Sequence, residues 1–178
     1  MTTMTTFDES GQQLFFTDNT TIITEKLAHL GVTLEQWQAS TPITPNLSNE
    51  AILDAYAKDI QRLKDSGGYQ SVDVISLQPN TPNHTALRQK FLAEHTHAED
   101  EVRFFVDGSG MFYLHIGDRI YTILLGKGDL ISVPAGVPHW FDMGPSPQFT
   151  AIRLFTNPDG WIAQLTGSTI AQNIPYYE

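Results

Sequence analysis

Two segments decide the fold of this chain: His95-Thr96-His97-Ala98-Glu99-Asp100-Glu101, and Gly128-Asp129-Leu130-Ile131-Ser132-Val133-Pro134-Ala135-Gly136-Val137-Pro138-His139. The first has the spacing H-x-H-x-x-x-E, and the second ends in a histidine after G-x5-P-x-G-x-x-H. Alternate residues of a strand point to the same face, so His95 and His97 converge. Glu101 shares their parity if the extended geometry resumes after Glu99. With His139 delivered from a neighbouring strand, the pattern predicts a metal site of imidazole nitrogens and one carboxylate.

An isolated H-x-H pair is more often solvated or hydrogen-bonded than metal-bound, but here two separate segments agree at several fixed spacings. Imidazole ligands suit Zn, Cu, Fe and Ni. Four protein ligands on an octahedral metal leave two open positions, which suit a substrate that chelates through two oxygens. Zinc closed by four ligands would instead be structural. The absence of cysteine argues against that second reading.

Arg103 shares the strand parity of Glu101 and is predicted to face inwards beside the ligands. In a site shielded from water, a guanidinium stabilises negative charge that develops on a substrate. The competing interpretation is a simple ion pair with Asp100 or Glu101. We favour the catalytic role for Arg103, with Arg153 as a second inward cation on weaker grounds.

The composition excludes several classes of protein. Among 178 residues the net charge is −10, and an acidic surface repels nucleic acid and anionic lipid. No cysteine is present, which excludes disulfides and thiolate nucleophiles. Met1–Asp8 lacks the features of a signal peptide, and no apolar run approaches the roughly 20 residues that span a bilayer. We expect a cytoplasmic protein with no nucleic-acid or membrane partner, and a monomer, because no segment stands out as an exposed apolar interface.

Residues 1–94 are predicted to be a helical part packed on a barrel. Helices are expected from Asn19 to Gly31 and from Ser48 to Gly67, because capping residues and apolar spacing coincide there. A third helix is expected over Thr85–Glu94, with Leu87 and Phe91 on one face. Leu14–Phe16 and Ser71–Leu77 are predicted strands.

From residue 95 the pattern changes to short strands separated by turn residues. The predicted strands are Val102–Val106, Met111–Ile116, Arg119–Leu125, Leu130–Val133, Trp140–Met143 and Phe149–Phe155. Asp107–Gly110 and Gly117-Asp118 are predicted hairpin turns. The fold class is therefore mainly β, a jelly-roll barrel with flanking N-terminal α-helices. One domain over 1–178 is expected, with the metal-binding core at 95–156 and a tail at 157–178 that contains a short helix near Trp161.

Three runs carry a specific resemblance: Phe91 to Gly110, FLAEHTHAEDEVRFFVDGSG; Leu130 to Phe141, LISVPAGVPHWF; and Ile152 to Phe155, IRLF. They resemble the acireductone dioxygenase family of the cupin superfamily, whose fold is a double-stranded β-helix. The likeness is strongest over the C-terminal half, and Gly68–Leu77 is its best segment in the N-terminal half. The chain departs from the general cupin pattern at Gln89, where glycine is frequent, and at Met143, where asparagine is frequent.

The resemblance implies an enzyme of methionine salvage that cleaves the acireductone 1,2-dihydroxy-3-keto-5-methylthiopentene with O2. One Fe(II) or Ni(II) per monomer is the implied cofactor. The iron form would yield formate and 2-keto-4-methylthiobutyrate, and the nickel form formate, carbon monoxide and methylthiopropionate. By the same resemblance His95, His97, Glu101 and His139 are the ligands, and Arg103 promotes the substrate dianion.

Two further groups of residues are named on weaker grounds. Glu94 and Asp100 match accessory family positions linked to metal uptake and to relaying local change. The aromatic residues predicted to wall the substrate pocket are Phe91, Phe104, Phe141 and Trp161. The alternatives are another metal cupin enzyme, such as a sugar-phosphate isomerase or a different dioxygenase, and a non-catalytic cupin that binds a small molecule.

Overall fold

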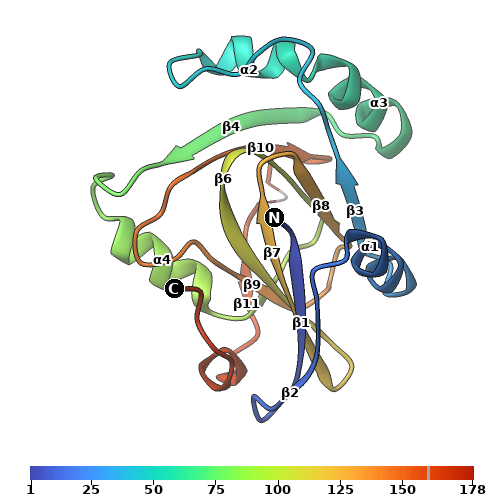
Figure 1. Cartoon of the computed structure of the whole chain (residues 1–178), viewed down its shortest axis with the longest axis vertical. Helices are drawn as coiled ribbons and strands as arrows, with labels where there is room; N and C mark the ends of the chain where they lie inside the picture. The colour runs from blue at the N-terminus through green and yellow to red at the C-terminus, as the bar shows by residue number, and fades with distance from the viewer. Residues whose placement is uncertain (160) are drawn as a thin grey trace.

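The structure has more residues in strands than in helices (Figure 1). The computed structural model describes residues 1–159 and 161–178. The strands are β1 (Thr3–Asp8), β2 (Gln13–Thr17), β3 (Thr33–Gln36), β4 (Ser71–Leu77), β5 (His95–Thr96), β6 (Glu101–Ile116), β7 (Arg119–Gly126), β8 (Asp129–Val133), β9 (His139–Asp142), β10 (Phe149–Phe155) and β11 (Gln164–Leu165). The helices are α1 (Thr20–His29), α2 (Asn49–Ala55), α3 (Ala57–Gly67), α4 (His84–Leu92) and a 3-10 turn, η1 (Ile170–Asn173). Within the described residues, no helix is long and apolar enough to cross a membrane.

The long strand β6 joins two layers of sheet. Its first part pairs with β8 and β10, and its second part pairs with β7 and β9. One layer has the order β11-β5-β9-β6-β7-β1-β2, and in the other β4 pairs with β10 and β3 with β8. The layers wrap around a common interior, with α2 and α3 over β4 (Figure 1). This is the mainly β, cupin-type barrel with flanking helices that the sequence predicts.

Side-chain alternation along β6 divides the core in two. Phe105 and Phe112 point into the barrel, where they pack with the aromatic rings of Phe141 and Phe149. Phe104 points to the opposite face and joins the core under α2 and α3. Burial of apolar area on both faces of this strand is a large stabilising contribution.

The sequence predicts a helical N-terminal part with two strands. The structure has four strands there. β1 pairs with β7, β3 with β8 and β4 with β10, so each of them completes a sheet formed by the C-terminal half. The predicted strand at Leu14–Phe16 forms part of β2, and the predicted strand Ser71–Leu77 is β4. β1 and β3 have no counterpart among the predictions.

Two of the predicted helices have the expected N-caps, and the third, predicted over Thr85–Glu94, is α4 without a side-chain cap. The Asn19 side chain accepts hydrogen bonds from the amides of Thr21 and Ile22, and Ser48 accepts one from Ala51. The single helix predicted from Ser48 to Gly67 is wrong, because the structure has two helices, α2 and α3, that meet at Tyr56. The Tyr56 ring packs edge-on against Phe104, 4.6 Å between centroids, so the break turns an aromatic side chain into the core.

β6 continues through Asp107–Gly110, where the sequence predicts a hairpin turn, so that prediction is wrong. The register against β10 shifts beside this point, which marks a β-bulge. Gly108 has φ of +73°, and a Cβ there would overlap the carbonyl oxygen of Gln148. A Cβ on Gly110 would overlap the ring of Phe141. These glycines therefore permit a bulge and close packing rather than a chain reversal.

The tail differs from its prediction at one point. Described residues beside Trp161 form turns, so the predicted short helix near this residue is wrong. The tail instead pairs β11 with β5 and forms its helical turn later, at η1. It then ends beside α4 (Figure 1).

Candidate metal centre

Three adjacent segments bring the predicted ligands together. His95 lies on β5 and pairs with His139 on β9, while Glu101 begins β6. His97 follows β5, and its carbonyl oxygen accepts a hydrogen bond from the amide of Gly136, at 3.0 Å. One potential ligand atom from each of the four side chains lies within 4.8 Å of the others. The two sequence motifs thus meet at one point in space.

Backbone carbonyls fix the orientation of all three histidine rings. Nδ1 of His95 lies 2.7 Å from the carbonyl oxygen of Ala93, and Nδ1 of His139 lies 2.7 Å from that of Val137. Nδ1 of His97 lies 3.0 Å from the carbonyl oxygen of Ile162 in the tail. A carbonyl only accepts, so each Nδ1 carries hydrogen and each neutral ring presents the Nε2 lone pair.

The charge state of the cluster suits a cation. Burial opposes the charged form of Glu101, but Arg103, His139 and His97 outweigh it and hold the pKa of this carboxyl well below its usual range. Burial, with His139 nearby, lowers the pKa of His95 to about 4. At neutral pH Glu101 is therefore anionic and His95 is neutral, the states that metal coordination requires.

The residues present fit a divalent metal ion. Oε2 of Glu101 lies 3.0 Å from Nε2 of His97 and 2.8 Å from Nε2 of His139, so the donor atoms already converge. The side chains of these three residues are at most 12% exposed. Buried lone pairs without a cation are costly, and the nitrogen and oxygen donor set is one that first-row divalent metals accept.

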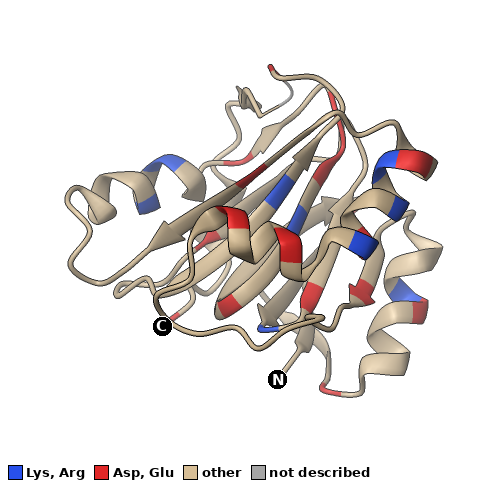
Figure 2. Cartoon of the chain, turned by 90° about the horizontal axis from the view of Figure 1, so that it is seen from above, with Lys and Arg blue, Asp and Glu red and all other residues tan. Residues whose placement is uncertain are grey.

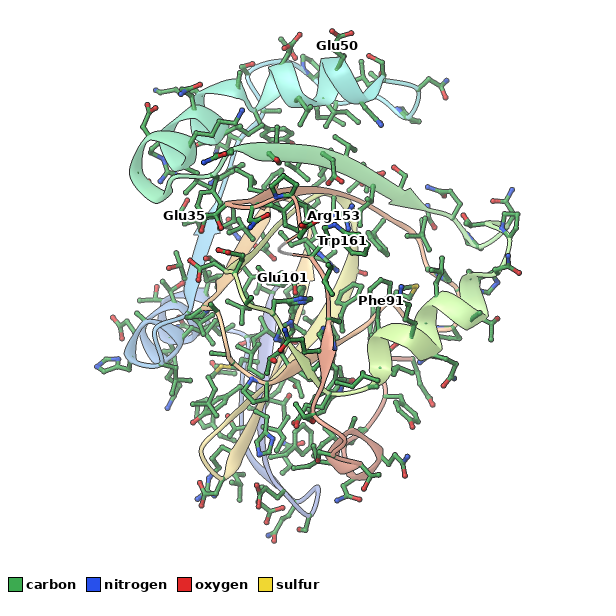
Figure 3. All side chains as sticks on the ribbon, turned by 180° about the vertical axis from the view of Figure 1, so that it is seen from behind. Glu35, Glu50, Phe91, Glu101, Arg153 and Trp161 are labelled. Carbon is green, nitrogen blue, oxygen red and sulfur yellow. The ribbon has the colours of Figure 1, made fainter. Side chains whose placement is uncertain are left out.

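A cavity of about 160 Å³ opens on the cluster, a size that suits a small molecule and not a polymer. Phe91, Phe141 and Trp161 line it as predicted, and Figure 3 shows Phe91, Trp161 and Arg153 around Glu101. Other lining residues were not among the predicted pocket walls: Lys90, Val102, Phe155 and Ala163. Lys90 and Ala163 lie outside the barrel strands, where strand alternation gives no signal.

Phe104 does not line this cavity, so its prediction as a pocket wall does not match its position. Its ring stacks on Trp37 at 4.8 Å between centroids, under α2 and α3. The reason is strand parity: if Arg103 points inwards, the next residue points outwards.

Arg103 lines the cavity next to the predicted metal ligand Glu101. Its guanidinium lies 2.9 Å from Oε1 of Glu101 and over the rings of Phe141, at 4.7 Å, and Phe112, at 5.2 Å. Its Nε is buried and has no hydrogen-bond partner among the described residues. The ion pair with Glu101 uses Oε1, whereas the histidines approach Oε2, so pairing and a role in the cavity are compatible.

Arg153 faces the same cavity from β10, where it pairs in register with Arg103. Its guanidinium is held by both carboxylate oxygens of Asp73, at 2.9 and 2.6 Å. The cavity therefore carries several cationic groups beside a single anionic ligand.

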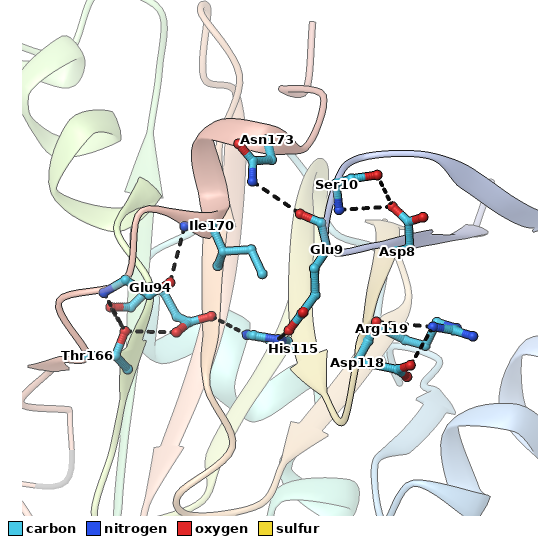
Figure 4. Close-up of polar contacts among 11 residues, drawn as sticks. Asp8, Glu9, Ser10, Glu94, His115, Asp118, Arg119, Thr166, Ile170 and Asn173 are labelled. Atoms are coloured by element: carbon cyan, nitrogen blue, oxygen red, sulfur yellow. Dashed lines mark hydrogen bonds and ion pairs between the residues drawn. The ribbon is translucent and has the colours of Figure 1, made fainter.

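Glu94 and Asp100 lie beside the cluster and are not part of it. Glu94 accepts a hydrogen bond from the hydroxyl of Thr166, at 2.8 Å, and pairs with His115 at 2.7 Å (Figure 4). Asp100 accepts a hydrogen bond from the amide of Ala135. Glu94 thus anchors the tail, and Asp100 anchors the loop before His139.

Known proteins resemble this chain in sequence over most of its length. The model of the ARD/ARD′ family matches residues 1–163. An acireductone dioxygenase from Alcanivorax borkumensis is 58% identical over 146 residues, 82% of this chain and 81% of the relative. One from Marinobacter nauticus is 51% identical over 181 residues, 100% of this chain and 97% of the relative.

A solved structure, the acireductone dioxygenase from Bacillus anthracis with a cadmium ion in its active centre, superposes with a TM-score of 0.81. It is 31% identical and covers 92% of this chain and 98% of its own. By sequence and by fold, this chain belongs to the acireductone dioxygenase family and is an enzyme of that family.

Proposed function

We propose that this metal-dependent dioxygenase cleaves 1,2-dihydroxy-3-keto-5-methylthiopentene with O2 in methionine salvage. The observation that carries the proposal is the convergence of the four ligand side chains at the base of a small cavity lined by Arg103 and aromatic rings. An acireductone is an enediol next to a ketone, so two of its oxygens can chelate a metal while its carbon tail needs an apolar wall. The cavity offers both environments.

The proposed cofactor is one Fe(II) or Ni(II), held by His95, His97, Glu101 and His139. The cadmium ion in the Bacillus anthracis relative supports a divalent metal at the equivalent centre. A metal bound there supplies Lewis-acid chemistry and a template for the substrate oxygens. Ligand type does not separate iron from nickel, so the products are expected to follow the metal supplied.

Besides the metal ion, the proposed catalytic group is the side chain of Arg103. Its guanidinium is fixed by Glu101 and by two aromatic rings, and it faces the cavity. Such a preorganised cation stabilises the enediolate dianion, the electron-rich form that reacts with O2. It therefore favours loss of the substrate's hydroxyl protons at neutral pH.

The methylthio tail is proposed to bind against the aromatic rings that line the cavity: Phe91, Phe141, Phe155 and Trp161. Trp161 is 53% exposed although it lines the cavity, so part of its surface is available to a ligand. Burial of the tail against these rings excludes water from the reacting carbons.

The test is anaerobic reconstitution of metal-free protein with Fe(II) or Ni(II), followed by addition of the acireductone and O2. We expect 2-keto-4-methylthiobutyrate and formate from the iron form, and carbon monoxide, formate and methylthiopropionate from the nickel form. Glu101→Ala is the matched control, because it removes a ligand and is expected to lose most of the bound metal. Metal uptake by the wild type without O2 consumption would contradict the proposal and favour a binding cupin or another metal enzyme.

A further inference from the structure

Helix α4 forms one wall of the cavity, and its residues Leu87 and Phe91 pack against the barrel core. Lys90 and Phe91 line the cavity from this helix. It has nine residues, Leu92 is its buried residue, and Asn83 before it makes no side-chain cap hydrogen bond. An isolated helix of this length is marginal in water, so contacts with the rest of the molecule must fix its position.

Arg88 provides a charged contact between this helix and β9. Its Nε lies 2.7 Å from Oδ1 of Asp142 and its Nη2 lies 3.0 Å from Oδ2. The Asp142 side chain is fully buried on β9, three residues after the ligand His139. A bidentate guanidinium–carboxylate pair of this kind restricts both position and angle. It ties α4 to the strand that carries a metal ligand.

The end of the chain completes the same junction. The amide of Tyr177 donates to Oδ2 of Asp142 at 3.0 Å, and its carbonyl oxygen accepts from Nη2 of Arg88, also at 3.0 Å. Two further hydrogen bonds hold this segment to β6: Tyr113 donates to the carbonyl of Pro175, and the hydroxyls of Ser109 and Tyr177 lie 2.9 Å apart. In Figure 1 the C-terminus accordingly lies beside α4.

The charged side chains of α4 are all positive, and Asp142 supplies the opposite charge. α4 carries Arg88 and Lys90 and no acidic residue, as Figure 2 shows at the left of the view. Arg88 and Phe91 are three positions apart and so lie on neighbouring turns of one helix side. A shift of Arg88 therefore moves the Phe91 ring.

We infer that Arg88, Asp142 and Tyr177 form a clasp that positions Phe91 and so determines how tightly the substrate tail is bound. The inference rests on the proposed function for the identity of that substrate. None of the three residues lines the cavity, so they act through α4 as positioning residues. The clasp governs recognition of the tail and leaves the chemistry at the metal centre to the ligands and Arg103.

The experiment compares the wild type with Arg88→Lys and with a chain that ends at Pro175. Lysine keeps the charge but loses the bidentate geometry, and the shortened chain keeps the Arg88–Asp142 pair but loses Tyr177. Arg62→Lys is the matched control, because Arg62 forms an exposed helix-borne pair with Glu35. Each protein is loaded with Ni(II) and assayed with the methylthio acireductone and with an analogue that lacks the methylthio group.

For both clasp variants we expect KM for the methylthio substrate to rise about tenfold, while kcat changes less than about twofold and metal content is unchanged. KM for the analogue should change much less. Hydrogen exchange at the amides of residues 87–92 should become faster in the same variants and not in Arg62→Lys.

Unchanged exchange in the clasp variants would overturn the inference, and so would an equal rise in KM for both substrates. If the variants lose nickel together with kcat, the residues support the metal centre instead, which also overturns it. Absence of turnover in the wild type overturns the proposed function, whereas the exchange measurement still decides whether the clasp holds α4.

Discussion

The Arg103 guanidinium pairs with Glu101, and the same group is held in a fixed orientation at the cavity wall. We expect Arg103→Lys to retain the metal and to lose about 100-fold in kcat, because lysine keeps the charge but not the planar, oriented donors. Metal content by elemental analysis and steady-state O2 uptake check this outcome. Arg119→Lys, an exposed position beside Asp118, is the control and should behave as the wild type. Wild-type turnover in Arg103→Lys would show that the guanidinium geometry is dispensable.

His115 links three separate segments through Glu94, on one side of its ring, and Glu9 on the other (Figure 4). Burial acts to lower its pKa, but the hydrogen bonds with Glu94 and Glu9 prevail and raise it above its ordinary value. A raised folded-state pKa stabilises the fold fully below about pH 6.5, the ordinary value of histidine, and this stabilisation is lost as pH rises through the folded-state pKa.

His115→Gln should therefore destabilise the protein more at pH 6 than at pH 9. Urea unfolding at the two pH values measures the difference, with His29→Gln at an exposed helix position as the control. The same loss of stability at both values would mean that the charge on His115 contributes nothing.

The ligands could be predicted at this scale because the fixed spacings of the two motifs act over a few residues. Strand parity alone does not place Glu101, because residues 97–100 lie outside the strands. The carbonyl of Ile162 that orients His97 could not, because it reaches the ring from 65 positions further along the chain. Phe104 is aromatic like the pocket walls, but its parity along β6 is opposite to that of Arg103 and turns it away from the cavity. Its ring belongs to the core under α2 and α3.

The strand β6 depends on glycines, although glycine usually weakens or ends a strand. Gly110 is buried, and a Cβ there would overlap the ring of Phe141, which also lines the cavity. We expect Gly110→Ala to cost about 1–3 kcal/mol of unfolding free energy, the usual effect of overpacking, and to displace that ring. Denaturant unfolding measures the loss. Gly126→Ala is the control, because a Cβ there would make only ordinary contacts, with the nearest atom at 3.6 Å. Equal stability of Gly110→Ala and the wild type would contradict this account of the packing.

Element prediction succeeded where local chemistry decides the outcome and failed where a distant partner does. Asn19 and Ser48 mark true helix starts because capping involves only the next few amides. The Asp107–Gly110 turn was predicted from composition, but neighbouring strands on both sides keep this segment extended. β1 and β3 exist because β7 and β8 offer free edges, which no local pattern records.

For the whole molecule, a bound metal joins segments that lie far apart in the chain. We expect Ni(II) at 100 times its dissociation constant to add about 2.7 kcal/mol to the unfolding free energy and to raise Tm by roughly 5–10 °C. A chelator should reverse the shift, and His139→Ala should abolish it because one ligand is missing. Differential scanning calorimetry provides the measurement. An equal shift in His139→Ala would place the metal elsewhere.

The pairing of the first strands with the last has a consequence for how the protein is made. Thr3 pairs with Leu124, Thr33 with Ser132 and Ser71 with Phe155. On the ribosome, the earlier residue of each pair emerges long before its partner has been synthesised. Contacts so distant in sequence close slowly and leave strand edges exposed meanwhile. The barrel therefore completes only after nearly the whole chain has been released, and nascent chains that stop short of Phe155 are candidates for chaperone binding and degradation.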